Sequence, residues 1–471
     1  MYCLFFRIQW FGNLISPKWW DDLWLNEGFA TFFEYVGVDM VETDWDMMNY
    51  MALDCIQYSF DTDSLETSRP IYQQVWTPND INNIFDVITY YKGASVIRMM
   101  WFFLGKENFR RGLRDYIKNR EYGSAQHDDL WEALSDESKA NGTNIDVRRV
   151  MDTWVEQKNY PLVTVTNTSN GFKLTQQRFL LRNSSQDNQT AGILDIETAL
   201  HTLDYLNSET EYIPWGAAVK ELAYLDRMLV STPVYGNFER FMIDKVNKTF
   251  MEHQLDISID QSVQKILLQS SVASRACKYG IKTCANEATK KFNVWKDNID
   301  SYIIAPDIRR TVLCTALRHG SSEDWDFLFS RYANSSSNDQ RTYLDALSCS
   351  TDNWVLHRYL DYSIGRGDTT IRSQDARFAI LAVASNPLGL QMTWSPGLDS
   401  YALNQIVFGM ARLLYTDYDV AEVEKWNTEH LELANSLNGF KQGIETIKNN
   451  KAWVDHNYND MASWLQTNYP N

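Results

Sequence analysis

The sequence predicts a mostly α-helical protein, with a short β segment between a helix-rich N-terminal region and a C-terminal α-solenoid of helix pairs. Apolar residues recur at three- and four-residue spacing through most of the chain, and a stretch after residue 160 alternates with a period of two. Short polar breaks separate the helical segments. At roughly 150 residues per domain, the 471 residues allow about three domains.

The first helical region extends from Trp19 to about Met151. Its periodicity is clearest in DLWLNEGFATFFEYVGV, KGASVIRMMWFFLG and DDLWEALSDE, where apolar residues fall on one face of a helix. We therefore place the first domain at residues 1–155.

The β segment covers residues 156–193. In PLVTVTNTSNGFKLTQQRFLL the residues alternate and are rich in β-branched and aromatic types, and Asn170-Gly171 is typical of a hairpin turn. A lone hairpin is marginally stable in water and leaves open edges, so we expect it to pair with another element or with an element that has been lost.

The third domain, residues 194–471, is a succession of amphipathic helical segments with short Asn, Asp, Gly and Ser breaks. Such a succession is typical of an α-solenoid. Because the sequence shows no strict period, this prediction rests on the density of helices and not on a repeat signature.

Charge excludes one class of partner. The net charge is −17 and the pI is about 4.9, and no run of Lys and Arg occurs. Such a surface repels phosphate backbones, so we expect no nucleic-acid binding.

Two kinds of local signal bear on the compartment. The six cysteines include no C-x-x-C pair, so neither a zinc knuckle nor a redox motif is predicted, while disulfides remain possible. N-x-S/T sequons suit a secreted glycoprotein. They begin at Asn141, Asn167, Asn183, Asn188, Asn247 and Asn334.

Neither end of the sequence carries the signal that a secreted or anchored glycoprotein would need. MYCLFFRIQWFGN lacks the basic and small-residue regions of a signal peptide, and WLQTNYPN lacks a hydrophobic anchor. The conflict with the sequons suggests an incomplete reading frame.

Residues 9–35, QWFGNLISPKWWDDLWLNEGFATFFEY, resemble the segment that follows the zinc motif of aminopeptidase N-type zinc metallopeptidases. In that family H-E-x-x-H is followed after eighteen residues by a glutamate, and the three ligands leave one zinc position open for water or substrate. The resemblance implies Glu27 as the metal-ligand glutamate, and Glu34, on the same helix face, as its support. From periodicity alone, Glu27 would be a solvated residue of an amphipathic helix.

Counting back from Glu27 places the family's two histidines at Leu4 and Ile8 and its catalytic base at Phe5. The first histidine of the sequence is His127, and no two histidines are four residues apart. A zinc site draws on the order of 10 kcal/mol from its full ligand set, which one carboxylate cannot supply. We therefore expect this chain not to bind zinc usefully and to be inactive, although the complete family site holds zinc.

A second resemblance covers residues 68–100, SRPIYQQVWTPNDINNIFDVITYYKGASVIRMM. It implies that Tyr90 is the catalytic tyrosine that donates a hydrogen bond to the oxyanion of the tetrahedral intermediate. Tyr91 is adjacent, but the spacing to Lys92 favours Tyr90; by composition alone, Tyr90 would be a half-buried core residue. Arg69 stands where the family has a histidine.

The resemblance spans most of the chain. It implies that residues 1–155 are part of a thermolysin-like catalytic domain and that 156–193 are the remnant of a small β-sandwich, with strands deleted between Gln189 and Leu194. It also implies two disulfides, Cys277–Cys284 and Cys314–Cys349, which suit an oxidising compartment. Without it, Cys277 and Cys284 would be small apolar residues on one helix face. The family's G-A-M-E-N loop, which helps to grip the substrate's α-amino group, does not occur in this sequence.

Two hypotheses about function remain open. The first is a truncated or misannotated aminopeptidase N homologue, whose complete form removes N-terminal residues from peptides; the second is a non-catalytic binding protein that uses its helical solenoid. The resemblance also implies peptide substrates, a possible homodimer, and a place outside the cell or on the outer face of the plasma membrane. Truncation should expose apolar side chains of the catalytic domain. Those we expect to be exposed are Trp10, Phe11, Trp19 and Trp20.

Overall fold

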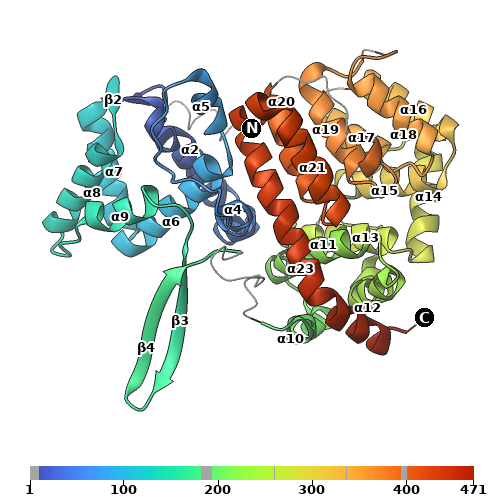
Figure 1. The fold of residues 1–471 in the computed structure, drawn as a ribbon, viewed down its shortest axis with the longest axis horizontal. Coiled ribbons are helices and arrows are strands. Elements are labelled where there is room, and N and C mark those ends of the chain that lie inside the picture. The colour runs from blue at the N-terminus through green and yellow to red at the C-terminus, as the bar shows by residue number, and fades with distance from the viewer. Residues whose placement is uncertain are drawn as a thin grey trace. The chain divides into compact units, whose positions relative to one another are not determined.

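A computed structural model describes residues 10–181, 194–258, 260–335, 337–368, 370–393 and 400–470 (Figure 1). The chain divides into two compact units, Met1–Ala191 and Gly192–Asn471. The prediction of a mostly α-helical protein is confirmed, whereas the division of the first unit at residue 155 stays a prediction.

The first unit is built around α2 (Trp24–Val41) and α6 (Gly93–Leu104), which pack against each other. Its core contains fully buried aromatic side chains, among them Trp24 and Trp131. The remaining helices of this unit are η1 (Trp20–Asp22), η2 (Thr43–Trp45), α3 (Met47–Met51), η3 (Ala52–Gln57), α4 (Tyr58–Asp63), α5 (Pro78–Asn83), η4 (Ile88–Lys92), α7 (Lys106–Arg120), α8 (His127–Ala140) and α9 (Val147–Val155).

Two short strands accompany the helices of the first unit: β1 precedes the region that periodicity predicts as helical, and β2 interrupts it. β1 (Ile15–Pro17) pairs in parallel with β2 (Gly123–Ala125), and Ile15 lies opposite Gly123. Three-residue strands are too short to give a recognisable alternation, which is why the sequence does not reveal them.

The hairpin of β3 (Pro161–Thr168) and β4 (Gly171–Arg178) is present, with Thr168 opposite Gly171 (Figure 1). The predicted turn is off by one residue: Ser169 and Asn170 are its central residues, and Gly171 begins β4. Gly171 has a φ of 142°, a conformation that glycine adopts without strain. One face of the hairpin carries exposed apolar side chains, namely Val163, Val165, Phe172 and Leu174.

The second unit is a solenoid-like succession of helices, in which many consecutive helices contact each other and the 31-residue α23 (Asn438–Asn468) contacts α10, α12 and α20 to α22. The other helices of this unit are α10 (Ile196–His201), η5 (Asp204–Ser208), α11 (Tyr212–Leu229), α12 (Tyr235–His253), α13 (Val263–Lys278), α14 (Lys282–Asp297), α15 (Pro306–His319), α16 (Ser322–Ala333), α17 (Ser337–Leu347), α18 (Asn353–Ser363), α19 (Ser373–Ala384), η6 (Leu390–Met392), α20 (Ser400–Ala411), α21 (Asp417–Glu429) and α22 (Leu431–Ser436).

Two disulfides join helices of the second unit. Cys277 of α13 is bonded to Cys284 of α14, and Cys314 of α15 is bonded to Cys349, which follows α17. These are the pairs that the family resemblance implies. Cys55 is a buried free thiol, whereas Cys3 lies outside the described residues.

The expected exposed aromatic surface is present only in part. Trp10, Trp19 and Trp20 are 40–51% exposed, but the prediction for Phe11 is wrong. Phe11 is buried because its ring stacks on Phe29 at a centroid distance of 4.5 Å. None of the described helices combines the length and the apolar composition needed to cross a membrane.

Candidate active site

A close approach of two helices positions Glu27. Glu27 lies in the first turn of α2 and is followed by Gly28. A Cβ atom added to Gly28 would lie 3.2 Å from the carbonyl carbon of Gly93, at the start of α6. Only the absence of side chains at this crossing allows the backbones to come so near, and the helical turn η4 leads directly into it.

Glu27 and Tyr90 meet beside this crossing. Tyr90 lies in η4, three residues before Gly93, and its phenol donates a hydrogen bond to the Glu27 carboxylate. Burial raises the pKa of Glu27, and the hydrogen bond from Tyr90 opposes that rise. The structure thus joins the two residues that the sequence places 63 positions apart.

The N-terminal end of η4 is fixed by Asp86. One carboxylate oxygen accepts hydrogen bonds from the backbone N–H groups of Ile88 and Thr89, each at 3.0 Å. Arg69, which is almost fully buried, donates to both Asp86 oxygens at 3.0 and 2.6 Å and to the Thr89 hydroxyl at 2.7 Å. Arg69, which the resemblance aligns with a family histidine, therefore supports the turn that carries Tyr90.

The C-terminal end of η4 is fixed by Lys92. Its ammonium group lies 2.8 Å from Asp63 Oδ2, and both side chains are at most 6% exposed. Lys92 also donates to the carbonyl oxygen of Asn159, whose backbone N–H donates to Asp63 Oδ1. Burial lowers the pKa of Lys92, whereas the charge of Asp63 opposes this effect. Tyr90 is thus anchored on both sides.

Tyr91 and Glu34, the residues that the sequence places beside Tyr90 and Glu27, lie in a different environment from the Glu27–Tyr90 pair. The ring of Tyr91 packs edge-on against Tyr58 at 5.4 Å. Burial raises the pKa of Tyr91, and the charges of nearby residues, including Glu34, add to the rise. Burial also raises the pKa of Cys55 to about 12, again with a contribution from Glu34. Glu34 therefore lies near Tyr91 and Cys55, two turns along α2 from Glu27.

The described residues around Glu27 do not fit a three-ligand zinc site. In the described ranges, the His, Cys, Asp and Glu side chains that lie close enough to share an ion form one group, to which Glu27 does not belong. Leu4, Phe5 and Ile8, which the resemblance aligns with the family's ligand and base positions, lie outside the described residues, and the chemistry of these side chains offers no metal ligand. A zinc ligand set at Glu27 would need donors from elsewhere.

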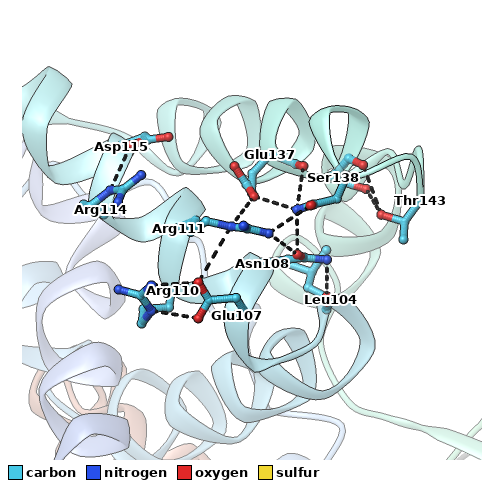
Figure 2. Close-up of polar contacts among 11 residues, drawn as sticks. Leu104, Glu107, Asn108, Arg110, Arg111, Arg114, Asp115, Glu137, Ser138 and Thr143 are labelled. Carbon is cyan, nitrogen blue, oxygen red and sulfur yellow. Dashed lines mark hydrogen bonds and ion pairs between the residues drawn. The ribbon is translucent and has the colours of Figure 1, made fainter.

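The sequon at Asn141 is structurally engaged. Figure 2 shows the ion pair between Arg111 and Glu137, at 2.7 Å, that connects α7 to α8. Asn141, at the end of α8, uses its amide nitrogen to donate to Asn108 Oδ1 and Glu137 Oε1, each at 2.6 Å. A glycan on this nitrogen would have to replace these bonds. Asn167, Asn247 and Asn334 are exposed, whereas Asn183 and Asn188 lie outside the described residues.

Two family models match regions of this chain. Residues 7–154 match the Peptidase family M1 domain, and residues 174–449 match the ERAP1-like C-terminal domain. Together these matches cover most of the chain. The chain belongs to the aminopeptidase N-type family of metallopeptidases.

Individual relatives of this aminopeptidase family align along nearly the whole chain. Aminopeptidase Ey of Gallus gallus is 28% identical over 97% of this chain and 59% of its own length. Aminopeptidase N of Mus musculus is 27% identical over 98% of this chain and 59% of its own length. The thyrotropin-releasing hormone-degrading ectoenzyme of Mus musculus is 26% identical over 97% of this chain and 54% of its own length.

The chain thus spans less than two thirds of the length of these relatives. The alignment with aminopeptidase Ey extends over 578 positions, more than the 471 residues of this chain. The aminopeptidase therefore contains segments, within the aligned part, that have no counterpart here.

Sequence reasoning missed the groups that hold η4 in place. Asp86 carries a recognisable signal, because an aspartate just before an apolar helical run is a frequent helix cap. Lys92 also carries one, since a lysine inside an apolar run is seldom buried without a partner. Its partner Asp63 carries none, because its role depends on contacts across the fold.

Proposed function

We propose that this protein is an aminopeptidase N homologue whose complete form removes N-terminal residues from peptides, and that residues 1–471 by themselves do not hydrolyse peptides. The supporting observation is the contact between Glu27 and Tyr90, together with the finding that Glu27 belongs to no group of potential metal ligands among the described residues. The relatives' names attribute aminopeptidase activity to them, which supports the choice of peptides as substrates.

The chemistry of the two side chains fits this proposal. A phenol is a directed donor that can stabilise an oxyanion without adding a full charge, and the anchored η4 turn would keep Tyr90 in place for that task. A zinc ion supplies the activated water in this family. Because the residues present do not fit that ion, we derive no hydrolytic step for this chain.

The test is to measure zinc content and hydrolysis on the same purified chain. We expect no stoichiometric zinc at Glu27 and no cleavage of leucine or alanine chromogenic amides, with mouse aminopeptidase N as the positive control. Chelator-sensitive cleavage that is abolished in both E27Q and Y90F would contradict the inactivity of this chain. Cleavage that survives both substitutions would point to a contaminating peptidase.

The compartment follows as part of this proposal. The disulfides Cys277–Cys284 and Cys314–Cys349 favour an oxidising environment, and one relative is named an ectoenzyme. We therefore propose an extracellular location for the helical unit. Both bridges should be oxidised when the protein is isolated from its native source, which mass spectrometry of peptides from unreduced protein can establish.

A hollow in the helical unit favours a second candidate function, non-catalytic peptide binding. It encloses about 1360 Å³ and is lined by five basic and four acidic side chains. The basic members are Arg227, Lys278, Arg310, Arg318 and Arg341. Lys278 pairs with Asp226, and Arg310 and Arg341 share Asp345, so basic side chains exceed acidic ones by only one. In a chain with a net charge of −17, this slight local excess of positive charge favours ligands that carry carboxylates.

Charge reversal at the edge of the hollow tests this alternative. Arg310, whose side chain is 58% exposed, lines the hollow, whereas Arg366, 70% exposed, does not. A fluorescent acidic hexapeptide should bind the wild-type chain, bind R310E more weakly and bind R366E unchanged. Equal binding by all three proteins, or none by the wild type, would eliminate this function.

A further inference from the structure

Three potential metal ligands converge at the contact between α8 and α9. His127 is the first residue of α8, Asp152 lies in the last turn of α9, and Glu156 caps that helix. One ligand atom from each lies within 4.8 Å of the others. Oxygen and nitrogen ligands of one tetrahedral ion are roughly 3.4 Å apart, so a rotation of the exposed Glu156 side chain would complete such a set.

The imidazole of His127 is already oriented for coordination. Its Nδ1 atom lies 2.7 Å from Asp22 Oδ1, and its backbone N–H donates to Asp22 Oδ2 at 3.1 Å. Asp22 Oδ1 also accepts from the Trp24 indole at 3.1 Å, and the side chains of His127 and Asp22 are only 10% and 5% exposed. A carboxylate that accepts from Nδ1–H leaves the Nε2 lone pair free to bind a cation, as in carboxylate–histidine–metal arrangements.

Among the described residues, no ion pair neutralises the carboxylates of Asp152, in α9, and of Glu156, which caps it. Asp152 and Glu156 are four residues apart, where like charges on a helix repel each other. They also lie at the C-terminal end of the helix, where the dipole disfavours anions and favours cations. In the described part of the chain, no donor contacts the buried Oδ1 atom of Asp152. A bound cation would relieve all three unfavourable features.

The nearby cation Arg148 does not neutralise the carboxylates of Asp152 and Glu156, because it pairs with Asp128. Asp128 is 3.8 Å from His127 Nε2, and Arg148 pairs with Asp128 at 2.6 Å. The ring of Tyr72 covers His127 edge-on at 4.7 Å, which limits access of water from that side. Burial acts to lower the pKa of His127, but the hydrogen bond and charge of Asp22 outweigh this effect and raise it. A proton on Nε2 is therefore the competitor of a metal ion.

We propose that His127 Nε2, Asp152 and Glu156 bind one divalent transition-metal ion of the Zn²⁺ or Mn²⁺ class. One imidazole and two carboxylates form a mixed nitrogen and oxygen ligand set suited to these ions. The ion would fix α9 against α8 and, through Asp22, against η1. The site shares no residue with the Glu27–Tyr90 pair, so it is independent of the proposed function.

Isothermal titration calorimetry on the full 471-residue chain tests the site. Metal-free protein at about pH 8, where the imidazole releases its proton more readily, is titrated with Zn²⁺ and separately with Mn²⁺. We expect one ion per chain, with affinity at least about tenfold weaker in E156Q and in D152N. E132Q, an exposed glutamate of α8 outside the set, should bind like the wild type, as should E27Q.

A second readout separates binding from misfolding. Glu156 is exposed, so E156Q should retain the wild-type circular dichroism spectrum, and the ion should raise the melting temperature of the wild type more than that of E156Q. The proposal is overturned if the wild type binds no ion, if folded E156Q and D152N bind as tightly as the wild type, or if E27Q is the variant that loses the ion. The last result would assign the ion to Glu27.

Discussion

The Glu27–Tyr90 pair and the His127–Asp152–Glu156 cluster lie in the same unit, yet each has what the other lacks. The first is surrounded by a motif that identifies its family, and buried ion pairs hold its tyrosine, but it offers one carboxylate to a metal. The second has three convergent potential metal ligands and an oriented imidazole, but it contains no recognisable sequence motif. A motif therefore indicates the family from which a site descends, whereas the capacity of that site to bind a metal depends on the ligand atoms that converge there.

The largest expected effect is on the scaffold of the Glu27–Tyr90 pair. Replacement K92M leaves Asp63 as an uncompensated buried charge, which should lower the free energy of unfolding of the first unit by about 3–5 kcal/mol. Urea denaturation followed by tryptophan fluorescence measures the loss.

The matched control for K92M is R110M. Arg110 pairs with Glu107 at 2.7 Å on the surface of α7, where both side chains are more than half exposed (Figure 2). Exposed pairs contribute at most about 1 kcal/mol. Equal losses in K92M and R110M would mean that the Lys92–Asp63 pair does not stabilise η4.

The next effect concerns the orientation of His127. Substitution D22N puts an amide donor where Asp22 accepts from His127 and Trp24, and should cost about 1.5–3 kcal/mol of unfolding free energy. It should also weaken the proposed metal site by about 10- to 100-fold, because the carboxylate fixes the ligating tautomer.

Asp21 provides the control for D22N. Its carboxylate accepts one hydrogen bond, from the backbone N–H of Val75, and it has no contact with His127 among the described hydrogen bonds. D21N should therefore leave metal affinity unchanged in the same calorimetric titration. A D22N protein that binds metal like the wild type would show that Asp22 does not prepare the histidine.

A smaller effect is expected at Tyr90. Y90F removes the phenol that donates to the partly buried Glu27 carboxylate, and loss of such a bond should cost about 1–2 kcal/mol. Y91F is the matched control, since Tyr91 packs against Tyr58 and is not the phenol that contacts Glu27. Thermal unfolding of both variants decides the question, and a larger loss in Y91F would reverse the assignment of the two tyrosines.

The same contrast explains how much the sequence could reveal. The helices, the hairpin and the neighbourhood of Glu27 follow from periodicity and a family motif, because these signals are local. The meeting of His127 with Asp22 depends on contacts between residues 105 positions apart, and Phe11 is buried by Phe29 in a later helix. Neither contact leaves a local pattern, so neither could be read from the chain.

The smallest effect is the contribution of Glu27 to the pH dependence of stability. Burial raises its pKa above the ordinary value of 4.5, so the folded state binds this proton more tightly than the unfolded state does. The resulting stability is fully present below the unfolded pKa and is lost as the pH rises through the folded pKa. E27Q lacks this titration, so its melting temperature relative to the wild type should increase as the pH rises above the ordinary pKa of a glutamate. E132Q, an exposed glutamate on α8, serves as the reference. A relative melting temperature of E27Q that stays flat would mean that folding does not raise the pKa of Glu27. A relative melting temperature that falls as the pH rises would mean that Glu27 is stabilised as a carboxylate, as a residue that holds a cation would be.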